Sequence, residues 1–80
     1  NAICPGWVRT PLVERQIERI AAERELTIDA AARELLGAKQ PSGAFVTPAQ
    51  IGAMAVFLCG DAAEQITGAA LPIDGGWTAQ

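Results

Sequence analysis

The sequence predicts an α/β fold built around parallel strands, and three observations carry that prediction. A short apolar stretch at residues 1–4 ends at Pro5-Gly6, as the end of a strand does. Three helix starts follow, and residues 69–73 then form a second apolar run of strand length. A strand, a helical connection and another strand make up the crossover unit of a parallel sheet.

The first two helices are predicted from their caps and their apolar spacing. The Thr10 hydroxyl can cap a helix, and Pro11 is tolerated in the first turn, where its missing N–H is no loss. Thr27 can cap a second helix that stops at Gly37. Apolar stripes of helical spacing follow the two caps, comprising Val13, Ile17, Ile20 and Ala21, then Ile28, Ala32, Leu35 and Leu36.

The third helix has the clearest start in the chain. Thr47 and Gln50 form a capping box, with Pro48 at the first helical position. We expect this helix to end at Gly60 and one short helical turn to follow. Its apolar residues cover so wide a surface that we expect burial on more than one side.

The last strand ends in a turn at Asp74-Gly75-Gly76. A strand is not stable unpaired, and we expect the partners of this one to lie outside residues 1–80. The connection between the two strands is unusually long, and such insertions often cover a ligand site in open α/β folds.

Composition narrows the possible functions and points to part of a larger domain. The 80 residues carry a net charge of −3, which argues against a nucleic-acid partner. No apolar run approaches the roughly 20 residues that span a bilayer, and a chain without His cannot form a His/Cys zinc site. Cys4 and Cys59 are read as free thiols, with a disulfide as the alternative. Few large side chains are available for a core, and no Met begins the chain.

Four segments in this order resemble the C-terminal part of the short-chain dehydrogenase/reductase family. Residues 4–11 (CPGWVRTP) are similar to the family's P-G-x-V-x-T segment, and residues 47–51 (TPAQI) to the helix before its last strand. Residues 57–68 and 71–76 (LPIDGG) are similar to its F-L-x-S-D-x-A-x-x-I-T-G pattern and its closing turn. The resemblance covers essentially the whole chain and implies a Rossmann-type, doubly wound parallel sheet.

The chain also resembles the members that oxidise 3-hydroxybutyrate to acetoacetate. This narrower resemblance is carried by Trp7 and by residues 11–17, 32–36, 39–42 and 75–79. It implies NAD as cofactor, a small hydroxy acid as substrate and a cytoplasmic homotetramer. Residues 1–80 would be a C-terminal segment and not an independent domain. Lid helices would span about 11–37, and the last helix and strand about 47–76.

The resemblance also implies the roles of seven residues. The cofactor loop would comprise Pro5, Gly6, Val8 and Thr10. Gly6 would allow the backbone to approach the cofactor closely. The Val8 backbone would meet the nicotinamide carboxamide, and Thr10 would hydrogen-bond to the cofactor. The Gln16 amide would donate to the substrate carboxylate. Trp7 and Trp77 would wall a pocket for the substrate methyl group, although both could instead be packing residues.

The family's Ser–Tyr–Lys catalytic set is not matched within residues 1–80, because the chain has no Tyr and its only Lys is Lys39. We therefore expect these 80 residues to be inactive alone. Two alternatives stay open: a short-chain dehydrogenase for another hydroxyacyl or sugar substrate, and a non-catalytic module of three amphipathic helices. The helical module explains the apolar stripes, but not residues 69–73 followed by Asp-Gly-Gly.

Overall fold

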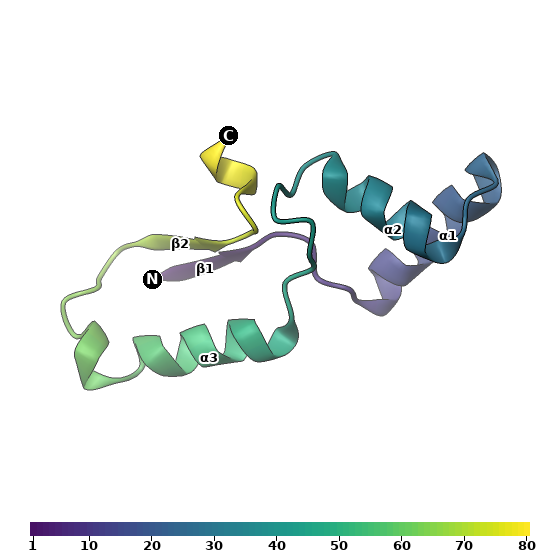
Figure 1. Ribbon diagram of the computed structural model, residues 1–80. Coiled ribbons are helices and arrows are strands. Elements are labelled where there is room, and N and C mark those ends of the chain that lie inside the picture. Colours follow the sequence, from purple (N-terminus) through teal and green to yellow (C-terminus); the bar gives the residue numbers. More distant parts are fainter.

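The computed structural model describes residues 1–80 as two parallel strands connected by three helices (Figure 1). Ala2 lies opposite Ala70 and Pro5 opposite Ile73, so both strands end at the same edge of the sheet. The predicted α/β class is therefore confirmed. The elements in order are β1 (Ala2–Pro5), α1 (Pro11–Arg24), α2 (Ile28–Gly37), α3 (Pro48–Leu58), the 3-10 turn η1 (Asp61–Ala63), β2 (Ala70–Ile73) and the 3-10 turn η2 (Trp77–Ala79).

The expectation that the last strand has no partner within the chain is wrong. β2 pairs with β1 over four residues, although nearly 70 residues separate them in sequence. The Asn1 side chain strengthens the start of this pairing, since it accepts from Ala69 N at 2.9 Å and donates to the Ile66 carbonyl at 2.7 Å. The helical connection thus returns the chain beside its first strand, as a parallel crossover requires.

All three predicted helix caps form. The hydroxyls of Thr10, Thr27 and Thr47 each accept from the backbone N–H three residues later, at 3.3, 3.1 and 3.1 Å. The Gln50 side chain returns a bond to Thr47 N at 2.9 Å, which completes the capping box. At its far end, α1 stops at Glu25, which adopts a left-handed conformation with φ of 52°.

α1 and α2 form a hairpin that lies to one side of the strands in Figure 1. The two helices share a small core of buried apolar side chains, and an Arg24–Glu34 ion pair links them at the surface. Because an exposed ion pair contributes little, the apolar contacts hold the hairpin together. The buried residues of this core are Val13, Ile17, Ala21, Ala31 and Ala32.

α3 does not have the burial that its broad apolar surface predicted. None of its residues is buried within the chain, and Val56 and Phe57 are 74% and 50% exposed. α3 flanks the strands on one side only (Figure 1). Its composition is therefore that of a buried helix, while its surroundings in residues 1–80 cover only part of it.

The molecule is elongated, measuring 50 × 25 × 15 Å. Its radius of gyration is 15.2 Å, whereas a compact domain of this length has a value of about 12 Å. Nine of the 80 residues are buried, so most side chains contact solvent. None of the helices has the combined length and hydrophobicity that crossing a membrane demands.

Candidate functional site

The carboxyl ends of β1 and β2 meet at a hollow of about 200 Å³. Gly6, directly after β1, donates its N–H to the Ile73 carbonyl at 3.1 Å and continues the strand pairing beyond Pro5. Ligands in open parallel sheets bind outside this edge. The hollow is lined by Cys4, Pro5, Gly6, Asp74, Trp77 and Thr78, which include three of the residues predicted for the site.

The two indoles lie side by side at this edge. The ring centroids of Trp7 and Trp77 are 5.9 Å apart, and the ring planes are tilted by 39°, a separation at which aromatic rings attract each other. The Trp7 Nε1–H is buried and has no hydrogen-bond partner. A buried donor without a partner costs free energy, and a bound polar group could accept from it.

The backbone that follows Trp7 offers hydrogen bonds to a ligand. The Val8 N–H has no partner within the chain, and the Val8 carbonyl accepts one bond, from Thr10 N at 2.9 Å. Since a carbonyl can accept twice, Val8 retains a free donor and a free acceptor position. That pair matches a carboxamide, which presents one acceptor oxygen and an NH₂ donor. The residues present therefore fit the nicotinamide group that the family resemblance implies.

Thr10 directly precedes α1, and Gln16 lies on that helix. The Thr10 hydroxyl caps α1 by accepting from Val13 N at 3.3 Å. Gln16 is half-buried and lines a different hollow, together with Leu12, Arg19 and Ile20. The structure thus places Gln16 on α1, and does not bring it into the hollow that Pro5, Gly6 and Trp77 share.

Gln40 also belongs to this region, although the sequence analysis did not predict it as a site residue. It lies in the loop between α2 and α3, where its neighbours favour neither a helix nor a strand, yet it is only 1% exposed. Its Oε1 accepts from Trp7 N at 2.8 Å, and its Nε2 donates to the Ala44 carbonyl. Only the folded structure shows that this amide is bonded to the predicted cofactor loop.

The space beside Gly6 is occupied by the chain itself. A Cβ at Gly6 would overlap Gln40 Oε1 and would lie 2.9 Å from Asp74 Cα. Glycine is therefore needed here to let the ends of β1 and β2 and the Gln40 side chain approach one another. This requirement is separate from the close approach to a cofactor that the sequence predicts for Gly6.

Asp74 organises the turn after β2. Its Oδ1 accepts from Gly76 N at 3.0 Å, and its Oδ2 accepts from the Thr78 hydroxyl at 2.8 Å and Thr78 N at 3.1 Å. The turn also needs positive φ at Gly75 (61°) and Gly76 (97°), which glycine adopts without strain. The pKa of the Asp74 carboxyl lies below its ordinary value, mainly because the Thr78 hydroxyl donates a hydrogen bond to the carboxylate.

We expect Asp74→Asn to reduce the free energy of unfolding of the complete protein at neutral pH, with a smaller reduction in acid. Because folding lowers this pKa, the carboxylate stabilises the fold above its unfolded pKa of about 3.9. That contribution is lost as the pH falls through the lower folded pKa. Urea unfolding at pH 7 and at stepwise lower pH measures the difference, with Asp61→Asn as an exposed control. A difference that does not change with pH would contradict the prediction.

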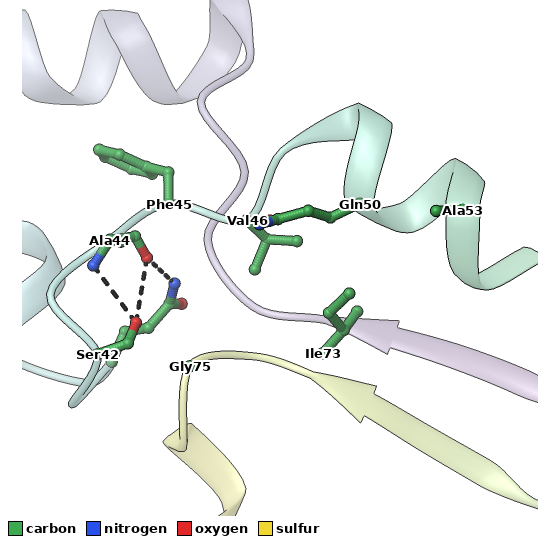
Figure 2. A pocket seen from close by; sticks show the side chains of 9 residues that line it. Ser42, Ala44, Phe45, Val46, Gln50, Ala53, Ile73 and Gly75 are labelled. Carbon is green, nitrogen blue, oxygen red and sulfur yellow. Dashed lines mark hydrogen bonds between the residues drawn. The ribbon is translucent and has the colours of Figure 1, made fainter.

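A larger hollow of about 530 Å³ lies between the loop after α2, the start of α3 and the end of β2. Figure 2 shows Phe45, Val46 and Ile73 around it, with Ser42 and Ala44 hydrogen-bonded to each other. None of the seven residues predicted for the site lines it. Volume alone therefore does not identify the site in this chain.

These features define an α/β protein with a hollow at the carboxyl edge of its parallel strands, the edge where open α/β folds bind ligands. Residues 1–78 match the family model described as Enoyl-(Acyl carrier protein) reductase. The chain belongs to the short-chain dehydrogenase/reductase family, which confirms the resemblance found in its motifs.

Two curated relatives and one solved structure show how much of such proteins the chain represents. It is 56% identical to D-beta-hydroxybutyrate dehydrogenase of Cupriavidus necator and 48% identical to that of Rhizobium meliloti, each over all 80 residues and 31% of the relative. A short chain dehydrogenase family protein from Francisella tularensis superposes with a TM-score of 0.83 at 33% identity, over 98% of this chain and 32% of that one. The chain thus spans about a third of the length of the proteins it matches.

Proposed function

We propose that residues 1–80 are part of an NAD-dependent dehydrogenase that interconverts 3-hydroxybutyrate and acetoacetate. The observation that carries the proposal is the Trp7–Trp77 pair, which stands beside the hollow at the carboxyl edge of the strands. The 56% identity to a relative named D-beta-hydroxybutyrate dehydrogenase supports the same substrate. The parallel pairing of β1 with β2 disfavours a purely helical interaction module.

In this proposal the loop after β1 holds the nicotinamide end of the cofactor. The free Val8 N–H donates to the carboxamide oxygen, and the Val8 carbonyl accepts from the carboxamide NH₂. Pro5 and Gly6 border the same hollow, and Thr10 completes the loop. When bound, NAD supplies the chemistry by accepting hydride from C3 of the substrate. Residues 1–80 contain no Tyr, so a base elsewhere in the enzyme takes the hydroxyl proton.

The substrate is held between the indoles and α1. Trp7 and Trp77 provide a rigid apolar wall for the methyl group, and the Gln16 amide donates to the carboxylate without cancelling its charge. Gln16 faces a separate hollow in this structure, so we propose that the α1–α2 hairpin is a lid that closes to bring it to the substrate. Closure of a helical lid excludes water and completes the site.

The segment would act within a larger domain and a homotetramer in the cytoplasm. The elongated shape and the exposure of Val56 and Phe57 support the larger setting, because apolar side chains of this size are usually covered. Lid residues 11–37 and the last helix and strand at 47–76 would then be parts of a single dehydrogenase domain.

The proposal is tested by assaying the complete protein that contains this chain. We expect reduction of NAD with D-3-hydroxybutyrate, followed as NADH absorbance, and at least about tenfold lower kcat/KM with the L-enantiomer or with a sugar alcohol. NADP serves as the comparison cofactor. Turnover of a sugar or a long-chain hydroxyacyl substrate in preference to 3-hydroxybutyrate would overturn the substrate assignment, and absence of turnover with either cofactor would overturn the enzyme assignment.

A further inference from the structure

Gln40 is the one polar residue buried in this chain. Both ends of its amide are bonded, Oε1 to the Trp7 N–H at 2.8 Å and Nε2 to the Ala44 carbonyl. The bonds connect the loop after β1 with the loop between α2 and α3, which are 33 residues apart in sequence. A buried amide used at both ends fixes two backbone segments relative to each other.

Three segments of backbone converge on this side chain. The glycine at position 6 leaves room for Gln40 Oε1, and the one at position 75 leaves room for its aliphatic part, since a Cβ at Gly75 would lie 2.6 Å from Gln40 Cγ. The Ser42 N–H also donates to the Gly75 carbonyl at 2.9 Å. The turn after β1, the turn after β2 and the loop at residues 40–44 therefore meet around one buried amide.

The Trp7 main chain is the part of the site that this amide controls. Its N–H is held by Gln40, and its carbonyl accepts from Val46 N at 2.9 Å. A displacement of this main chain moves the Trp7 indole against Trp77, and it also moves the Val8 backbone that follows. Both groups contact ligand in the proposed function.

We propose that Gln40 is a positioning residue that sets the Trp7–Trp77 wall and thereby the enzyme's selectivity for a short hydroxy acid. The inference rests on the proposed function for its substrate. In this role Gln40 itself touches neither substrate nor cofactor. It acts through the Trp7 main chain, and no other side chain hydrogen-bonds to that main chain.

The test uses the variants Gln40→Glu and Gln40→Met in the complete enzyme. The matched control is Gln65→Glu, because Gln65 is an exposed turn residue without a side-chain hydrogen bond. At neutral pH the introduced carboxylate still accepts from Trp7 N but has no proton for the Ala44 carbonyl, while Met can make neither bond. We expect kcat/KM for 3-hydroxybutyrate to fall about 5- to 100-fold in both variants. The preference for 3-hydroxybutyrate over 3-hydroxypentanoate should fall at least about threefold.

Acidification provides a second readout. Protonation restores an O–H donor to the introduced carboxyl, and burial raises its pKa toward the assay range. The ratio of kcat/KM for Gln40→Glu to that of the wild type should therefore rise from pH 8 to pH 6, while the ratios for Gln40→Met and Gln65→Glu stay constant.

The outcomes separate this inference from the proposed function. If the wild type fails to turn over 3-hydroxybutyrate, the proposed function is wrong. Near-ultraviolet circular dichroism of the tryptophan pair then tests the role of Gln40 separately, because Gln40→Met should change that signal. Folded variants with unchanged selectivity or an unchanged tryptophan signal would overturn the inference. Failure of both variants to fold would also overturn it, since Gln40 would then serve folding alone.

Discussion

Gln16→Ala in the complete enzyme should lower kcat/KM for 3-hydroxybutyrate about 10- to 150-fold, with a much smaller effect on NAD binding. A hydrogen bond to a charged carboxylate contributes about 1.5–3 kcal/mol, and the substitution removes that donor. Gln16 lies in the second turn of α1, next to Ile17, which belongs to the hairpin core. In the proposed lid closure, its amide would therefore move with α1 toward the substrate carboxylate. Steady-state kinetics and NAD titration measure the two effects separately.

Two comparisons make the Gln16 result specific. Gln16→Glu should be worse than Gln16→Ala, because it sets two carboxylates against each other. A neutral analogue without the carboxylate should be turned over almost equally by the wild type and Gln16→Ala. A kcat/KM within about twofold of the wild type for Gln16→Ala would place Gln16 at the surface and remove the main support for lid closure over this substrate.

Gly6→Ala should destabilise the complete protein by about 1–3 kcal/mol and abolish most NAD binding. The added Cβ would lie 2.9 Å from Asp74 Cα and 3.0 Å from Asp74 Cβ, and it would overlap Gln40 Oε1. The side chain of Gln40 can move aside, but the Asp74 backbone cannot without separating the ends of β1 and β2. Urea unfolding gives the loss of stability, and fluorescence titration with NAD gives the loss of binding.

Gly37→Ala is the matched control, since a Cβ at Gly37 meets no atom within 4 Å and the residue is the exposed last residue of α2. That substitution should stabilise the protein by at most about 0.5–1 kcal/mol through helix propensity. In a Gln40→Ala background, Gly6→Ala should retain part of its cost, because Asp74 stays in place. If Gly6→Ala proved as harmless as Gly37→Ala, the proposed convergence of the two turns would be incorrect.

The helix starts were predictable because their signals are local. Each cap needs a Thr hydroxyl and a backbone N–H three residues further along, so the information lies within one turn of chain. Thr10, Thr27 and Thr47 all cap as predicted. The Trp7–Trp77 proximity came only from the family resemblance, since nothing in the spacing of two residues 70 positions apart indicates contact.

Two expectations were wrong where a distant part of the chain decides the outcome. The partner of β2 is β1, at the opposite end of the sequence, and pairing over such a separation leaves no periodic signal in either strand. The apolar breadth of α3 predicted burial, but burial depends on what covers a helix, and none of its residues is buried here.

The sequence alone determined the α/β class, the helix caps, the two glycine turns and the family, because these depend on residues near one another or on motifs read in order. Only the tertiary structure revealed that Gln40 is buried and that its amide is bonded at both ends. A glutamine in a Pro- and Gly-containing loop is ordinarily solvated, and its burial follows from three backbone turns that meet around it. The two bonds of its amide join segments that come together only when the strands pair.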